Sequence, residues 1–383
     1  MPRLVISTVG TSLLTNQIDP DCDLDSLESQ LIETVNCSEK DFQRYHPELS
    51  SSLQDLKDRA KKALSKNDDV SSFRSVSAEL NGIYGFYFND LAQGREDAHL
   101  LIATDTAQGQ LAANLLAAHL KSKGIDNTSV LHADELSIAS SRIFSEGIAK
   151  LLPYLQQTIE GYRSSNYQIC FNLVGGFKAL QGFFNVIGMF YADELIYIFE
   201  GSNELIKIPK LPVKIDPTRV EPHKVPLAMM AVGDIRTSWE EAKKVPQEWT
   251  LPLDQEMTLS TWGSLVWSRC KETLLTDKLL EFPRIFYDES FKSDYRRPVV
   301  TKARKVELHE KLARVATQLM KFNGDTSRFD RNLHYTRYEG GKINHIDHFY
   351  VNNDDGWRVS CIAKNGNLYL RHYGEHDYVN NNP

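Results

Sequence analysis

The 383-residue sequence lacks the features of membrane and secreted proteins. No stretch approaches the roughly 20 consecutive apolar residues that a membrane-spanning helix needs. The start, Met1–Arg3 followed by Leu4–Ile6, is too short to be the apolar core of a secretory signal and is typical of a first strand. We therefore expect no membrane association and a cytoplasmic location.

Cysteine is also sparse. The five cysteines are odd in number, scattered, and form no CxxC pair, which argues against a zinc site or a disulfide framework and for a reducing compartment. Two common nucleotide-binding motifs, GxGxxG and GxxxxGK[ST], are missing, so neither a dinucleotide fold nor a P-loop ATPase is supported. The cysteines are Cys22, Cys37, Cys170, Cys270 and Cys361.

Charge is distributed unevenly along the chain. The formal net charge is −7, yet residues 284–383 hold 17 Lys and Arg against 13 Asp and Glu. Six of the 11 histidines lie in the same stretch. A basic, histidine-rich last quarter on an acidic chain is a first, weak indication of a polyanionic partner such as nucleic acid.

Apolar patterning predicts an α/β domain over residues 1–215. Strand-like segments alternate with helix-like ones, which is typical of a mostly parallel sheet with helices on both faces. We expect strands at 4–9, 99–103, 129–132 and 167–174 and a hairpin at 194–208; helices are expected within 26–66 and at 107–123, 143–162 and 177–191, the last of them buried.

The Pro-rich stretch 211–226 marks the end of that domain. Residues 216–283 form an expected connecting module with one helix, 261–280. Residues 284–383 are expected to form a small α+β domain: a strand at 284–287, a helix at 307–321, and strands at 346–351, 358–363 and 368–373. The turn Asn365–Asn367 between the last two is a strong hairpin signal.

Three expected strand-to-helix junctions carry glycine and hydroxyl residues. They are Val9–Ser12, Thr104–Gly109 and Val174–Lys178. In a parallel sheet such junctions gather at the carboxyl edge, where backbone N–H groups favour anions such as phosphate. One such junction alone would be an ordinary βα turn, but three together favour a ligand site.

The same segments resemble the CARF domains of CRISPR-associated proteins. The resemblance covers residues 1 to about 215 and is carried by Thr8–Asn16, Thr104–Thr106, Asn172–Lys178 and Ile198–Glu204. It implies a Rossmann-like domain that forms a homodimer and binds a cyclic oligoadenylate, cyclic tetra-adenylate being the expected form, across the two-fold axis. It also implies that the ligand contacts are Gly10, Thr11, Ser12, Thr106, Gly175, Gly176 and Lys178.

The C-terminal stretch holds the residue types that cut RNA without a metal. That chemistry needs a group to deprotonate the 2′-hydroxyl, cations to stabilise the phosphorane, and an acid for the leaving 5′-oxygen. Each residue alone would be ordinary on a solvated strand face. The acidic residues show no metal-cluster spacing, and we expect neither a metal nor a cofactor. The His, Arg, Lys and Tyr residues on or beside the expected strands are His334, Arg337, Tyr338, Lys342, His345, His348, Tyr350, Arg358, Arg371, His372, His376 and Tyr378.

Residues 284–379 resemble the RelE family of ribosome-dependent mRNA endonucleases. The resemblance is carried by Phe286–Tyr295, by Asp355–Val359 and by a strand expected to end at Gly374–Tyr378. It implies that Arg358 binds the scissile phosphate, that His376 is the acid, and that Tyr378 occupies the family's C-terminal tyrosine region. The paired lysines that the family often carries are replaced here by His348 and Tyr350, so the base stays open among the expected catalytic residues Arg358, His376, Tyr378, His348, Arg371 and Lys342.

Together the resemblances imply a CARF sensor fused to a RelE-like ribonuclease. We expect a metal-independent endoribonuclease of CRISPR antiviral defence that the messenger activates and that cleaves mRNA on the ribosome. Two alternatives stay open. One is a CARF-domain transcription regulator whose tail binds DNA, and the other is a ring nuclease that degrades the messenger, for which Ser12 and Lys178 are suitable residue types.

Overall fold

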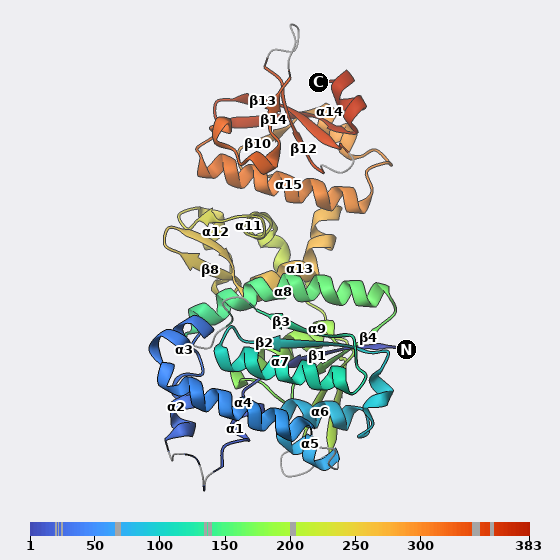
Figure 1. Cartoon of the computed structure of the whole chain (residues 1–383). Helices are drawn as coiled ribbons and strands as arrows, with labels where there is room; N and C mark the ends of the chain where they lie inside the picture. The colour runs from blue at the N-terminus through green and yellow to red at the C-terminus, as the bar shows by residue number, and fades with distance from the viewer. Residues whose placement is uncertain are drawn as a thin grey trace. The chain divides into compact units, whose positions relative to one another are not determined.

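A computed structural model of the chain divides into two compact units, Met1–Lys214 and Ile215–Pro383 (Figure 1). The structure describes residues 1–19, 21, 23, 26–65, 70–133, 136, 140–199, 204–338, 345–352 and 356–383, of which 141, 142, 145, 146 and 149 are described by their backbone alone.

The first unit is built on a six-stranded sheet of order β3-β2-β1-β4-β5-β6. All neighbouring strands are parallel except β5 and β6, which form the expected antiparallel hairpin. The predicted α/β class with a mostly parallel sheet is therefore confirmed. The strands are β1 Arg3–Thr8, β2 Ala98–Ala103, β3 Thr128–His132, β4 Gln168–Asn172, β5 Glu194–Ile198 and β6 Leu205–Pro209.

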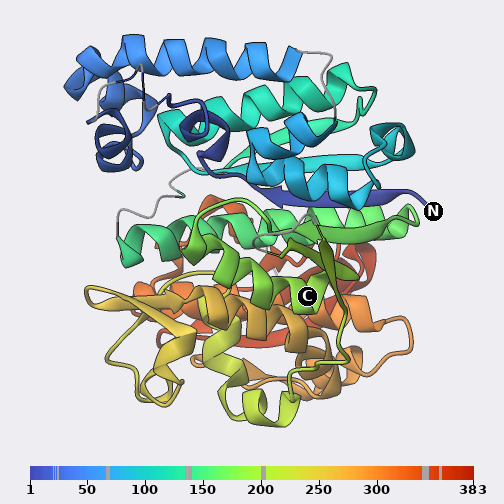
Figure 2. The same cartoon turned by 90° about the horizontal axis from the view of Figure 1, so that it is seen from below.

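Helices cover both faces of this sheet. Helices α4, α6 and α7 lie on one face, and α8 and α9 on the other (Figures 1 and 2). All six residues of β2 are buried, as a strand covered on both faces requires. The helices are α1 Ser12–Thr15, α2 Leu27–Glu33, α3 Glu39–Tyr45, α4 Ser50–Ser65, α5 Val70–Val76, α6 Ala78–Phe86, α7 Ala107–Ser122, α8 Ser141–Ser164 and α9 Lys178–Tyr191, with short 3₁₀ turns at Pro47–Leu49 and Leu91–Gly94.

The helix at 177–191, expected to be buried, is buried on one face only. Helix α9 buries Leu180, Phe184 and Ile187, but Val186 is 40% exposed and Lys178 is exposed as well. Composition alone misled here, because a helix on the outside of a sheet buries one face whatever residues cover the other.

The second unit contains two sheets. The larger has the order β10-β14-β13-β12-β11, in which β10 and β14 are parallel and the other neighbours antiparallel; the smaller has the order β7-β9-β8 and was not expected. The strands are β7 Ile235–Arg236, β8 Thr250–Leu253, β9 Glu256–Leu259, β10 Ile285–Tyr287, β11 Thr336–Arg337, β12 Asp347–Tyr350, β13 Arg358–Lys364 and β14 Asn367–Gly374.

One hydrophobic core runs through the second unit. It joins residues of the expected connecting module, such as Met229 and Trp267, to residues of the C-terminal sheet, such as Phe349 and Tyr373. The segments 216–283 and 284–383 thus share a core. The helices are α10 Pro217–Val220, α11 Lys224–Met230, α12 Glu240–Lys243, α13 Thr261–Asp277, α14 Glu289–Tyr295, α15 Lys302–Lys321 and α16 His376–Asn381, with 3₁₀ turns at Glu221–His223, Gln247–Trp249, Thr326–Arg328 and Arg331–Leu333.

The C-terminal end departs from the expected strand. Strand β14 stops at Gly374, and His376 begins the short helix α16. Gly374 pairs with Arg358, which is the first residue of β13, so the ladder has no further partner on that strand to continue. His376 and Tyr378 are therefore helical residues. Among the described residues, no helix is long and apolar enough to span a membrane.

Burial of histidines makes the first unit sensitive to acid. His119 is 4% exposed, and burial lowers its pKa to about 4. The folded state therefore stays neutral where the unfolded chain, with a pKa near 6.5, takes up a proton, so stability falls as the pH drops below about 6.5. His99 is also buried and its pKa is lowered in the same direction, to about 3.

We predict that His119→Gln weakens this pH dependence. Between pH 7.5 and pH 5, the unfolding free energy of the wild-type chain should fall by about 2 kcal/mol more than that of the variant. The reason is that the variant lacks the His119 side chain, which takes up a proton only when the chain unfolds. Urea unfolding at the two pH values measures it. The control is His132→Gln, at an exposed position. An equal change of unfolding free energy between the two pH values in the wild type and in His119→Gln would contradict the prediction.

Candidate functional site

Two of the expected ligand junctions meet in the first unit. Strands β1 and β4 are neighbours, so the chain after each strand emerges at the same edge of the sheet. A Cβ built on Gly10 would lie 3.1 Å from the backbone nitrogen of Gly176. Gly176 has a φ of +103°, which glycine adopts without steric cost. The two loops therefore touch through their backbones, as the sequence predicted for a shared site.

A buried carboxylate that the sequence analysis missed ties these loops together. Glu79, at the start of α6, is fully buried. Its Oε1 accepts a hydrogen bond from the Gly10 N–H at 2.8 Å, and its Oε2 accepts one from the Ser12 hydroxyl at 3.1 Å. Any side chain at Gly175 would collide with Glu79, because a Cβ there would lie 2.0 Å from Oε1.

These bonds leave some expected ligand residues already engaged. The Ser12 hydroxyl also accepts from the backbone N–H of Ala78 at 3.1 Å. The Thr106 hydroxyl accepts from the Gly109 N–H, which caps α7, and lies 3.0 Å from the Thr104 hydroxyl. In this structure the side chains of Ser12 and Thr106 therefore hold the loops through bonds within the chain.

Lys178 differs from these residues because it is exposed and uncommitted. It is the first residue of α9, immediately after the Gly176 turn. Within the part of the chain that the structure describes, it forms no hydrogen bond or ion pair. Lys178 is therefore the expected ligand residue whose charge stays available at this edge.

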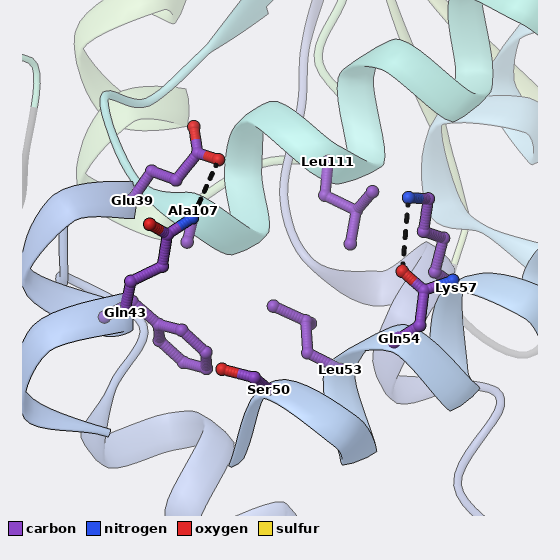
Figure 3. Close-up of a pocket in the computed structure, with 9 residues that line it drawn as sticks. Glu39, Gln43, Ser50, Leu53, Gln54, Lys57, Ala107 and Leu111 are labelled. Atoms are coloured by element: carbon purple, nitrogen blue, oxygen red, sulfur yellow. Dashed lines mark hydrogen bonds between the residues drawn. The ribbon is translucent and has the colours of Figure 1, made fainter. Parts of the chain in front are cut away.

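A separate surface pocket opens near the start of α7 (Figure 3). Its volume is about 230 Å³, and α3, α4 and α7 line it. Its polar side chains pair with each other, Gln43 with Glu39 and Lys57 with Gln54. The lining includes Ala107 but none of the residues that the sequence predicted to contact a ligand.

In the second unit, Arg358 stands at the centre of a polar cluster. Its side chain comes from the first residue of β13, and the residue is 3% exposed. One Nη donates to Asn380 Oδ1 at 2.8 Å, and the other donates to the Tyr350 hydroxyl at 2.5 Å. The guanidinium carbon lies 4.5 Å from the centre of the Tyr350 ring. The Nε of Arg358 is buried and has no hydrogen-bond partner among the described residues.

His348 adjoins this cluster on β12. Its Nε2 lies 3.1 Å from the Thr336 hydroxyl, and its ring lies 4.4 Å from the ring of Tyr338, measured between centroids. Burial, helped by the nearby charge of Arg358, lowers the pKa of His348 to about 4. Its Nδ1, like the Nε of Arg358, is buried without a partner in the described part of the chain. His348 is therefore a neutral imidazole with an unused ring nitrogen.

Helix α16 supplies the remaining members. Asn380 Oδ1 accepts from the Tyr338 hydroxyl at 2.9 Å as well as from Arg358. The amide nitrogen of Asn380 lies 3.3 Å from the His376 ring, one helical turn earlier. His376 is half exposed and pairs with Asp377 at 2.7 Å. The cluster that the structure brings together is thus Tyr338, His348, Tyr350, Arg358, His376 and Asn380.

Two expected catalytic residues lie elsewhere, and one is not described. The Tyr378 hydroxyl donates to Asp294 at 2.6 Å, which raises the pKa of Tyr378 and fixes α16 to α14. Arg371 is the extra residue of a β-bulge on β14, without a register partner on β13. Lys342 lies outside the described residues.

Asn380 was missed because a run of asparagines at a chain end carries no distinguishing signal. Its only signal is the four-residue spacing from His376, which places both on one face of a helix once the helix is known. Glu79 offered no signal at all, since 69 residues separate it from Gly10.

Residues 74–211 match the model of a family described as a CRISPR-associated protein, Cas_APE2256. The matched segment runs from α5 past β6 and includes Glu79, Thr106 and the Gly175–Lys178 junction. The match supports a role for the chain in CRISPR defence. It lies within the first unit and does not reach the Arg358 cluster.

We predict that Glu79→Ala destabilises the first unit. The change leaves the buried Gly10 N–H without an acceptor, removes one of the two bonds of the Ser12 hydroxyl and opens a cavity. Together these losses should cost about 2–5 kcal/mol of unfolding free energy. Denaturant unfolding measures it. Glu28→Ala, at an exposed position in α2, is the matched control, and a loss no larger than that of the control would contradict the prediction.

Proposed function

We propose that the chain is a ribonuclease effector of CRISPR defence, activated by a cyclic oligoadenylate, that cleaves mRNA on the ribosome by attack of the 2′-hydroxyl. One observation carries the proposal. Two buried polar atoms in one cluster, Arg358 Nε and His348 Nδ1, have no partner among the described residues. Buried polar groups are almost always hydrogen-bonded, so a pair of exceptions in one place favours a site made for a polar ligand.

The side chains of the cluster suit each step of the reaction. A neutral His348 is in the form that accepts the 2′-hydroxyl proton. The 2′-oxygen then bonds to phosphorus, the bond from phosphorus to the 5′-oxygen breaks, and His376 gives that oxygen a proton. Arg358 neutralises the phosphorane, because a guanidinium presents paired donors to phosphate oxygens. Tyr338 and Tyr350 orient the phosphate through the bonds they make around Arg358.

Arg358 needs a conformational change to do this. In this structure Asn380 holds one Nη, in the place where a phosphate oxygen would bind. Helix α16 spans six residues at the C-terminus and leaves Arg358 almost no exposed surface. In the proposal, substrate exchanges for the Asn380 amide when α16 shifts. The resting structure is then an inactive form.

In the first unit, the proposed ligand site is the edge where β1, β2 and β4 end. Lys178 provides a charge, and the Gly10 and Gly176 loops provide backbone N–H groups other than that of Gly10, which donates to Glu79. The central test adds cyclic tetra-adenylate to the chain with translating ribosomes and maps mRNA ends. Cleavage only with the messenger is expected, and no cleavage in either case would overturn the proposal.

We predict that Lys178→Ala weakens messenger binding. Loss of one charge-assisted hydrogen bond should cost about 1–3 kcal/mol. Isothermal calorimetry with cyclic tetra-adenylate measures both the affinity and the stoichiometry, for which one cyclic molecule per two chains is expected. Lys121→Ala, exposed near the other end of α7, is the matched control. An affinity equal to that of the control would remove Lys178 from the site.

We predict that Arg358 and His376 are needed for cleavage but not for messenger binding. His376→Ala should slow cleavage by about 10²–10⁴-fold, the usual effect of losing a general acid. Arg358→Ala should abolish cleavage, and Arg358→Lys, which keeps the charge but loses the fork, should be severely impaired. Cleavage is measured on ribosome-bound mRNA.

Both substitutions must leave the fold intact for that result to count. Each variant should melt near the wild type and bind cyclic tetra-adenylate normally. Because Arg358 is buried, Arg358→Ala can destabilise the fold. In that event the activity of Arg358→Lys decides the prediction. Arg296→Ala, exposed at the end of α14, is the control. A folded variant that cuts at the control rate would exclude that residue from the reaction.

We predict that the products carry 2′,3′-cyclic phosphate and 5′-hydroxyl ends. Attack by the 2′-oxygen can give no others at the cleavage step, whereas a metal-activated water leaves different ends. Among the described residues, no three His, Cys, Asp or Glu side chains are placed to share a metal ion. The measurement is end-group analysis of the mRNA fragments, which does not require removal of the magnesium that ribosomes need. A 3′-hydroxyl and 5′-phosphate pair would contradict the mechanism.

A further inference from the structure

Beside the Arg358 cluster, a pocket opens along the free edge of the five-stranded sheet. Its volume is about 570 Å³, large enough to admit one nucleotide. Strand β11 is the last strand in the sheet order, so one of its edges has no neighbour among the described strands. The lining includes Phe329, Arg331, His334, Tyr335, Thr336 and Arg337.

A buried carboxylate holds one arginine of this pocket in a fixed position. Asp347 is 2% exposed and accepts from Arg337 Nε at 2.9 Å and from the Tyr335 hydroxyl at 2.5 Å. The Arg337 side chain is nevertheless 66% exposed. Its two Nη groups have no partner among the described residues. The guanidinium is thus anchored at one nitrogen and presents the other two to solvent.

The formal charge of the pocket lining is balanced, two arginines against two aspartates, but the arginines keep N–H donors that no described residue engages. Arg331 is exposed and forms no ion pair within the described residues. The pocket lining also contains Asp330, whose carboxylate accepts from the backbone N–H of Asn332. Asp347 is already paired with Arg337. An anionic ligand therefore meets two available guanidinium groups.

Aromatic residues line the same pocket and connect it to the Arg358 cluster. Phe329 packs edge-on against Tyr335, with ring centres 5.2 Å apart. The His334 ring lies 6.2 Å from that of Tyr350, and the Thr336 hydroxyl lies 3.1 Å from His348 Nε2. Cations beside aromatic rings are how proteins bind single-stranded nucleic acid, the rings stacking on bases and the cations holding phosphates.

We infer that this pocket binds the nucleotide of the RNA strand that flanks the cleaved bond, with Arg337 and Arg331 on its phosphate and Phe329 against its base. The inference rests on the proposed function, because the pocket gains its meaning from the neighbouring cluster. Asp347 is then a positioning residue, which holds Arg337 in the orientation that a phosphate requires.

The experiment measures binding separately from cleavage. The probe is a fluorescein-labelled, 2′-O-methyl single-stranded RNA of about ten nucleotides, which cannot be cut by 2′-hydroxyl attack. Anisotropy titrations of the full chain should show that Arg337→Ala weakens binding by about tenfold, the effect of one lost charged hydrogen bond. The slope of log K against log salt should fall by about 0.7, as expected for one phosphate contact to a single strand. Phe329→Leu should weaken binding severalfold with the salt slope unchanged.

Matched variants make the result decisive. Arg296→Ala, at the exposed residue that follows α14 and outside the pocket lining, should bind as the wild type does. Arg337→Lys keeps a positive charge beside Asp347. If Arg337→Ala unfolds at a lower temperature than the wild type, the affinity of Arg337→Lys decides the result, and this variant should bind RNA more weakly than the wild type.

Wild-type affinity in both Arg337 variants, or no binding by the wild-type chain, would overturn the inference even if the chain cuts mRNA. Binding that depends on Arg337 in a chain that never cleaves would leave the pocket standing and refute the proposed function instead.

Discussion

The buried guanidinium of Arg358 is the constraint on which the C-terminal sheet and its last helix depend. A charge removed from water is costly unless its donors are paired, so the partners of Arg358 determine what packs around it. Tyr350 supplies one partner from β12, and Asn380 supplies the other from α16. The helix α16 is thereby fixed to β13, with the bond between Tyr378 and Asp294 as its second attachment.

The first unit depends on a comparable device of opposite charge. Glu79 is buried and satisfies a backbone N–H and a hydroxyl on the loop after β1, while it packs against Gly175 on the loop after β4. In both units a buried ionic side chain connects segments distant in sequence at the place where function is proposed. The difference is that Glu79 has the bonds it needs, whereas Arg358 and His348 each keep one buried nitrogen unpaired.

That difference gives the two proposed sites different properties. The junctions of the first unit are closely packed, which suits a site that must hold one geometry and offer backbone donors and Lys178 to a ligand. The Arg358 cluster is incompletely satisfied and covered by a six-residue helix, which suits a centre that opens for its substrate. The pocket beside it is open already, with Arg337 held in place by Asp347.

The sequence determined the class of the first unit, most of its elements and the meeting of the Gly10 and Gly176 loops, because strand periodicity and glycine positions are local properties. Residue type placed Arg358, His348 and His376 among its candidates, and the family resemblance singled out Arg358 and His376. Only the tertiary structure decided which polar side chains became buried partners. Glu79, Asp294 and Asn380 carry no local mark, and the strand expected at His376 is a helix because β13 offers no further ladder partner. The bonds of the Thr106 hydroxyl are local, to a residue three positions later, whereas those of Ser12 depend on Glu79 and Ala78, which folding alone brings near.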